Sequence, residues 1–139
     1  MRKLLAALLL ASAAACNDSS TDPGSGILPG NYPLVSANGK NVPAVAIQDG
    51  SGTYEVLRGR IVLRDNSTFV DSLNFRFTPT SGTAQSGWDV RQGNYVQNGD
   101  NVTLTFQPSP GTFQNYPITW INGNALAYAE EGLSLIYRK

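Results

Sequence analysis

Residues 57–77 have the sequence LRGRIVLRDNSTFVDSLNFRF, in which two alternating stretches flank the turn signal Asp65-Asn66. One side of the first stretch carries apolar or small residues, and the other carries arginines: Leu57, Gly59, Ile61 and Leu63 against Arg58, Arg60 and Arg64. A period of two is typical of a strand with one buried face and one face in water. The stretch is therefore predicted to form a β-hairpin whose second strand buries Phe69, Leu73, Phe75 and Phe77.

The same alternation recurs along the rest of the chain, between turn signals such as Asn38-Gly39 and Asn98-Gly99, and no segment shows a period of 3.6 residues. The expected strands cover 31–37, 42–48, 54–64, 68–77, 87–97, 101–107, 113–121 with 125–129, and 133–138. We predict an all-β domain, an antiparallel up-and-down β-barrel of about eight strands. Closure is preferred because an open meander would leave two exposed edges.

Two further stretches bear on closure: GNYPLVSANGKNVPA at residues 30–44 and LSLIYRK at residues 133–139. Together with the hairpin, they resemble the small lipocalin-like domains of bacterial lipoproteins. The resemblance implies that residues 28–139 form one lipocalin-like barrel, with Tyr32 standing where the wider pattern has Trp. It also assigns barrel closure to three residues: Gly30, Tyr32 and Arg138.

The N-terminus has the composition of an export signal. A basic start at residues 1–3 precedes an apolar run, residues 4–15, which is shorter than the ~20 residues needed to span a bilayer. Cys16, the only cysteine, follows three alanines, so the segment resembles a bacterial lipoprotein signal. The resemblance implies that Cys16 becomes the first mature residue and carries acyl chains. Ala13-x-Ala15 equally suits ordinary signal peptidase, which would leave a free thiol.

These features divide the chain into three segments: a signal peptide at 1–15, a flexible linker at 16–27 and the barrel domain at 28–139. The linker is expected to be unstructured because it is polar and rich in chain-breaking residues. The expected location is the bacterial cell envelope, anchored on the outside of the cytoplasmic membrane or on the outer membrane.

Composition excludes several classes of function. The chain has no histidine, and its one cysteine is the proposed anchor, so His-dependent catalytic triads and the usual zinc sites are absent. Without residues 1–15, eight basic and ten acidic side chains remain, a formal net charge of −2 that argues against nucleic acid as a partner. We expect a protein that is not an enzyme and needs no metal or cofactor.

Candidate binding residues are those that the alternation points inward. Asp71 lies on the apolar side of its strand and could bind a ligand cation or have a raised pKa. The alternatives are that a bulge turns it outward or that it lies at the wet mouth of the barrel. Glu55 is inward by the same count. Five aromatic residues are candidates for lining a pocket for a small apolar ligand: Trp88, Tyr95, Tyr116, Trp120 and Tyr128. A barrel filled by side chains is the alternative.

The sequence thus leaves more than one function open. The first hypothesis is a lipid-anchored, non-enzymatic binding or interaction module with an unknown ligand. The alternative is a filled barrel whose surface binds an envelope protein, for instance as an inhibitor scaffold. An outward arginine group could bind an anionic partner or be a solvated face: Arg58, Arg60, Arg64 and Arg76. A hydrolase built on Asp71 and Glu55 is the third hypothesis.

Overall fold

The computed structural model describes residues 28–130 and 132–139, and every regular element in them is a strand. The strands are β1 (Gly30–Ala37), β2 (Lys40–Asn41), β3 (Ala44–Asp49), β4 (Gly52–Leu63), β5 (Thr68–Pro79), β6 (Gln85–Asn98), β7 (Asn101–Ser109), β8 (Thr112–Ile121), β9 (Ala125–Glu130) and β10 (Leu133–Arg138). The predicted all-β class is confirmed. The predicted signal peptide, Cys16 and the rest of the predicted linker lie outside the described residues.

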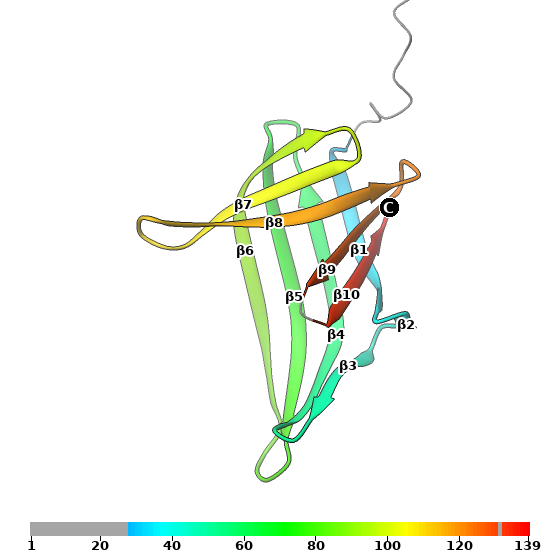
Figure 1. Ribbon diagram of the computed structural model, residues 1–139, viewed down its shortest axis with the longest axis vertical. Coiled ribbons are helices and arrows are strands. Elements are labelled where there is room, and N and C mark those ends of the chain that lie inside the picture. Colours follow the sequence, from blue (N-terminus) through cyan, green and yellow to red (C-terminus); the bar gives the residue numbers. More distant parts are fainter. Residues whose placement is uncertain (1–27, 131) are drawn as a thin grey trace, which may run out of the picture.

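Eight of the ten strands close into an antiparallel barrel (Figure 1). From β4 to β10 each strand pairs with the next, and β1 completes the cylinder because it pairs with β10 on one side and β4 on the other. The predicted up-and-down barrel is therefore confirmed. The expected strand at 42–48 corresponds to β3, which pairs with β4 outside the barrel, as β2 pairs with β1.

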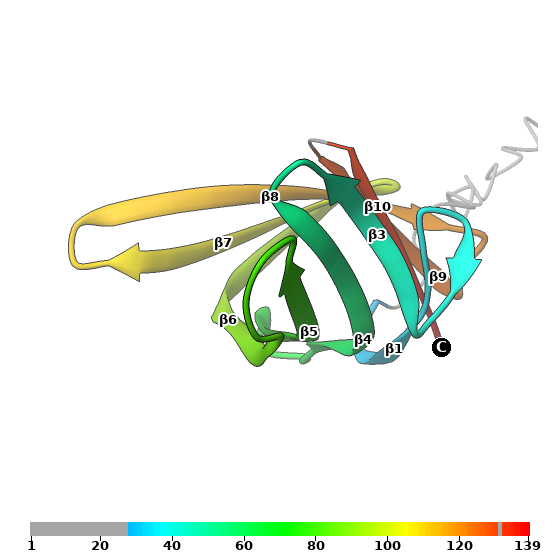
Figure 2. The same ribbon diagram turned by 90° about the horizontal axis from the view of Figure 1, so that it is seen from below.

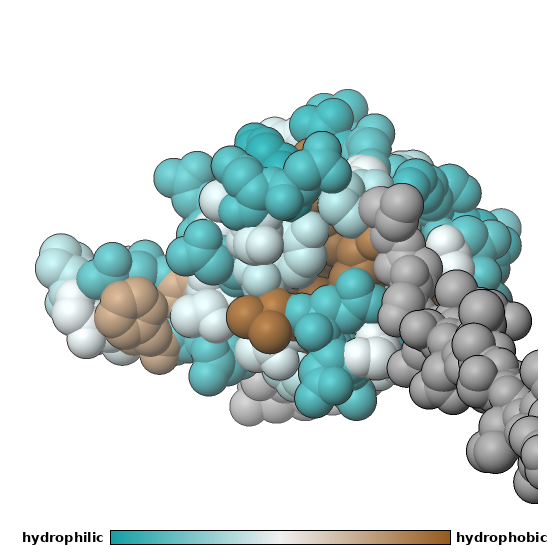
Figure 3. Space-filling view, turned by 90° about the horizontal axis from the view of Figure 1, so that it is seen from above, coloured by the Kyte–Doolittle hydropathy of each residue, from teal (hydrophilic) through white to brown (hydrophobic). Residues whose placement is uncertain are grey.

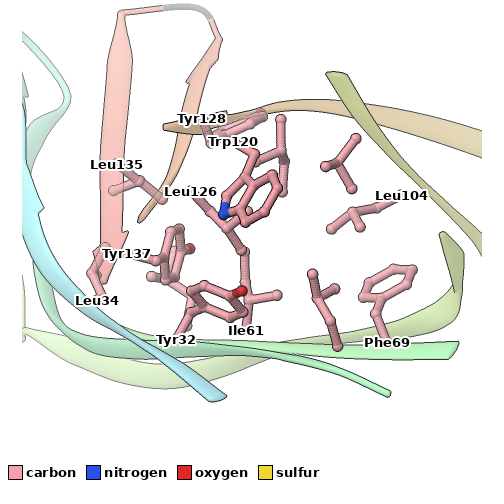
Figure 4. Packing of buried hydrophobic residues seen from close by; sticks show 14 of the residues in the cluster. Tyr32, Leu34, Ile61, Phe69, Leu104, Trp120, Leu126, Tyr128, Leu135 and Tyr137 are labelled. Atoms are coloured by element: carbon pink, nitrogen blue, oxygen red, sulfur yellow. The ribbon is translucent and has the colours of Figure 1, made fainter. Parts of the chain in front are cut away.

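Side chains from all around the barrel fill its interior (Figure 4). Tyr32 of β1 and Leu126 of β9 are fully buried, and Tyr137 of β10 is 2% exposed. The Tyr32 hydroxyl donates a hydrogen bond of 2.7 Å to the carbonyl of Leu28, which satisfies the buried polar atom of this ring. Trp120 of β8 packs into the same cluster.

The last residue of the chain completes the closure. Lys139 Nζ donates a hydrogen bond of 3.1 Å to the carbonyl of Pro29 and lies 5.8 Å from the centre of the Tyr32 ring. A Cβ on Gly30 would lie 2.8 Å from Lys139 Cε, so a glycine leaves room for this lysine. Arg138, the basic residue assigned to closure, is exposed, and Lys139 makes these contacts in its place.

A β-bulge in β4 changes the predicted faces. Gly59 and Ile61 point inward as expected, but the register shifts between Val56 and Arg58. An extra residue reverses the alternation on one side of a bulge. Val56 therefore continues the buried row in place of Leu57, which is half-buried. The expectation that Glu55 faces inward is wrong for the same reason.

The β7–β8 hairpin extends beyond the barrel wall. β6 pairs with β7 only from Gly93 to Asn98, so the far end of the hairpin has no neighbour on β6 and projects from the body (Figures 1 and 2). A Cβ on Gly93 would lie 2.0 Å from the Thr105 carbonyl oxygen, so only glycine permits this close approach of β6 and β7. Phe113 on the projecting end is 69% exposed, and Figure 3 shows an apolar patch on this arm.

The buried position of Trp120 leads to a test of the filled core. Trp120 is 4% exposed, so Trp120→Ala should lower the free energy of unfolding by about 3–5 kcal/mol through lost burial and a residual cavity. Thr119→Ala, at the adjacent exposed position, is the matched control and should change it by about 0.5 kcal/mol or less. Urea denaturation measures both, and equal small losses would contradict the inward position of Trp120.

Candidate functional site

A cavity of about 80 Å³ lies inside the barrel, between β4, β5, β6, β8 and β10. Three leucines, at positions 73, 133 and 135, form its apolar lining. The rest of the lining is polar or aromatic: Tyr54, Asp71, Asp89, Arg91, Tyr116 and Tyr137. We call this space the acidic cavity, because two of these residues are carboxylates and one is a cation.

Asp71 is the only charged residue buried in the described core. The alternation of β5 points it inward between Phe69 and Leu73, as predicted, and its side chain is 8% exposed. Its Oδ1 atom is buried and has no hydrogen-bond partner. The pKa of Asp71 is raised to about 6, chiefly by burial; Arg91 opposes this rise, the Asp89 carboxylate adds to it, and the Ser72 backbone N–H opposes it.

Arg91 is the cation whose charge acts on Asp71, but it donates its hydrogen bond to Asp89. It lies directly opposite Asp71 in the β5–β6 register, yet its Nη2 donates a hydrogen bond of 2.5 Å to Asp89 Oδ2. Its guanidinium carbon lies 4.5 Å from the centre of the Tyr116 ring and 5.3 Å from that of Phe106. These contacts hold the guanidinium in place by an ion pair and two cation–π interactions.

Tyrosines surround the carboxylate. Tyr116 stacks on Tyr128, with ring centres 4.3 Å apart, and Tyr54 stacks on Phe75 at 5.3 Å. Burial raises the pKa of Tyr137 well above its usual range, and the nearby Asp71 carboxylate raises it further. Tyr137 is therefore a neutral phenol at physiological pH.

The predicted aromatic residues do not form one pocket. Tyr116 lines the acidic cavity, whereas Trp120 and Tyr128 are buried in the core. Tyr95 is also buried, and its hydroxyl donates a hydrogen bond of 2.9 Å to the Arg64 carbonyl. The inward position expected for Trp88 is wrong, because its side chain is 52% exposed on the outside of the barrel.

The alternation of β6 explains why Trp88 faces outward and which residues of this strand face the acidic cavity instead. Trp88 and Tyr95 are an odd number of residues apart in the unbroken strand β6, so they must face opposite sides. With Tyr95 inward, Asp89 and Arg91 face inward too. The bulge in β4 turns Tyr54 inward, against the alternation that runs from Leu57 to Leu63, and Tyr137 lies on the inward side of β10 with Leu133 and Leu135.

A second hollow, of about 520 Å³, lies on the outer side of β4, β5 and β6. Arg58, Arg60, Ser72 and Trp88 line it, and the Arg58 guanidinium lies 5.0 Å from the centre of the Trp88 ring. Within the described part of the chain, neither arginine pairs with a carboxylate. Val90, the next outward residue of β6, is 59% exposed.

The other two arginines of the predicted anionic-partner group are engaged elsewhere. Arg76 forms an ion pair with Glu55 on the outer face, and its Nε donates a hydrogen bond of 2.9 Å to Glu55 Oε2. Arg64 Nη1 donates a hydrogen bond of 3.4 Å to Thr68 Oγ1. Arg58 and Arg60 therefore carry the positive charge of the outer hollow.

The comparisons add no relative to this picture: the chain matches no model of a known family, no curated protein and no solved structure. Among residues 28–130 and 132–139, no three metal-ligating side chains lie together. None of these residues belongs to a helix long and apolar enough to cross a membrane. The function is therefore inferred from the geometry of the acidic cavity and the outer hollow.

The raised pKa of Asp71 should make the stability of the protein depend on pH. Because its pKa rises from 3.8 to about 6 on folding, the native state binds a proton more tightly than the unfolded chain, and stability falls as the pH rises from about 4 to about 6. Asp71→Asn removes this effect. The free energy of unfolding of Asp71→Asn minus that of the wild type should therefore increase by about 3 kcal/mol from about pH 3.5 to pH 8.

Denaturant unfolding of both proteins across this pH range measures the difference. Asp100→Asn, at an exposed turn residue, serves as the control and should show no such increase. A pH-independent difference between Asp71→Asn and the wild type would show that the Asp71 carboxylate is solvated.

Proposed function

We propose that this protein is a lipid-anchored lipoprotein of the bacterial cell envelope and acts as a non-enzymatic interaction module, binding an acidic protein partner through its outer surface. The observation that carries the proposal is the outer hollow, where Arg58 and Arg60 flank the exposed Trp88 ring. The envelope location and the anchor rest on the lipoprotein-like N-terminus that ends at Cys16.

The size of the interior favours an outer binding surface. Pockets that enclose small-molecule ligands usually measure about 300–1,000 Å³. The acidic cavity, at about 80 Å³, is far smaller, and core side chains occupy the rest of the interior. A fatty acid or similar apolar ligand would not fit without displacing these side chains. This supports the filled-barrel hypothesis over an apolar ligand carrier.

The composition of the outer surface indicates the chemistry of the partner. The register aligns Arg58, Asn74 and Trp88 across three strands, and Arg60, Ser72 and Val90 in the next outward row. Tryptophan and arginine are the residues that most often dominate binding energy at protein interfaces. No carboxylate lines the hollow, so a partner with acidic groups would complement its charge.

The positions of the carboxylates argue against the hydrolase hypothesis. Asp71 points into the barrel, whereas Glu55 points outward and pairs with Arg76. A wall of the barrel therefore separates the two side chains, and they cannot act on the same bond as acid and base. Asp89, the other carboxylate of the acidic cavity, is paired with Arg91.

The partner surface can be tested by site-specific photocrosslinking in intact cells. A photoreactive residue at Val90 should give one discrete adduct, and a matched residue at the exposed Thr119 of β8 should not. The double variant Arg58→Glu/Arg60→Glu should abolish the adduct by charge repulsion, and Trp88→Ala should weaken it without lowering the melting temperature. An adduct that forms equally at both positions, or that survives charge reversal, would contradict the proposal.

The anchor has a separate test. Metabolic labelling with a palmitate analogue should mark the wild type and not Cys16→Ser, because the thiol carries an acyl chain in the proposed lipoprotein. Cys16→Ser should become soluble or remain a precursor, as fractionation would show. An unlabelled wild type with a free Cys16 thiol would instead support cleavage after Ala13-x-Ala15 by ordinary signal peptidase.

A further inference from the structure

The acidic cavity contains a group that folding alone does not explain. Asp71 Oδ1 is buried and has no hydrogen-bond partner. The inward residues on either side of it in β5, Phe69 and Leu73, are both apolar. Burying a carboxylate oxygen that accepts no hydrogen bond destabilises a protein, and an apolar side chain at this position would remove that cost. A buried acceptor without a donor indicates a site where a donor from outside the chain can bind.

The charge in the acidic cavity favours a cation. Asp71 and Asp89 contribute two carboxylates and Arg91 one guanidinium, which leaves one negative charge in excess when both carboxylates are ionised. Arg91 is held by Asp89 and by the faces of Tyr116 and Phe106, so it does not donate to Asp71. A water molecule could donate to Oδ1, but it would leave the excess charge uncompensated.

The lining distinguishes among cations. Only two carboxylates line the acidic cavity, and the described residues hold no cluster of three or more metal-ligating side chains. Ca²⁺ takes six to eight oxygen ligands, and Mg²⁺ keeps several bound waters beside one or two carboxylates, for which a cavity of about 80 Å³ has little room. An ammonium group carries several N–H donors for Asp71 and the tyrosine hydroxyls, and aromatic rings also attract it.

The size and entrance of the cavity limit the ligand further. About 80 Å³ accommodates a group of only a few heavy atoms. The side chains of Asp89 and Arg91 are 40% and 26% exposed, whereas Asp71 is 8% exposed. A ligand would therefore enter past the Asp89–Arg91 pair and reach Asp71 at the deep end.

We propose that the acidic cavity is a binding site for a small organic ammonium ion, which donates a hydrogen bond to Asp71 Oδ1. This site faces the inside of the barrel and is independent of the outer surface proposed to bind a protein. Asp71 is the anion that the ligand neutralises, and the Asp89–Arg91 pair forms the entrance.

The test uses methylammonium chloride as the probe and the full chain at constant ionic strength and pH 8. The amide resonances of Leu73 and Leu135 should shift saturably, with a dissociation constant in the millimolar range expected for so small a ligand. Asp71→Asn should weaken binding at least tenfold, whereas Asp100→Asn, a matched change at an exposed residue, should leave it unchanged. Tetramethylammonium, which has the same charge but no N–H group, should bind at least tenfold more weakly.

A pH titration of the wild type tests the site without any substitution. The charged and titratable groups facing Asp71 are Asp89 and Arg91 from β6, Tyr54 from β4, Tyr116 from β8 and Tyr137 from β10. Methylammonium affinity should fall about tenfold per pH unit below about pH 6, as Asp71 takes up a proton. Three results would each overturn the proposal: no saturable shift, equal binding of tetramethylammonium, or wild-type affinity in folded Asp71→Asn.

Discussion

The structure depends on the double pairing of β1. The first half of this strand pairs with β4 and the second half with β10, so one strand of eight residues closes the whole barrel. Tyr32 lies in the half that faces β4, fully buried, and its hydroxyl bonds the Leu28 carbonyl. Once the cylinder is closed, every strand has a fixed inner and outer face. Asp71 cannot turn into water without breaking the pairing of β5 with both of its neighbours.

Closure also explains why the outer hollow and the acidic cavity share three strands, β4, β5 and β6. Along β6, Trp88 and Val90 face outward while Asp89 and Arg91 face inward, so adjacent residues belong to separate sites. The outer surface is cationic and apolar, whereas the acidic cavity holds an excess negative charge. A substitution at Trp88 therefore changes the outer surface and leaves the inward row of β6 in place.

Closure into a barrel was predicted from the cost of exposed edges and from the resemblance to lipocalin-like domains. The alternation of residues 57–77 and of the later strands predicted the strands, their meander order and the inward side for Asp71. It failed where the period of two is interrupted. Nothing in the sequence of β4 signals the bulge between Val56 and Arg58, which reverses the faces of Glu55 and Tyr54. The Asp89–Arg91 pair follows from the face of Tyr95, but the position of Arg91 opposite Asp71 depends on a register between strands that alternation alone does not define.

The central claim is that a closed, filled barrel keeps one carboxylate away from water. The most direct measurement is the titration of the Asp71 side-chain carboxyl carbon by nuclear magnetic resonance in the ligand-free protein. We expect a midpoint near pH 6, because burial raises the pKa of Asp71 to about 6. A midpoint near pH 4, the value of a solvated aspartate, would contradict the account, because it would mean that water reaches the Asp71 carboxylate.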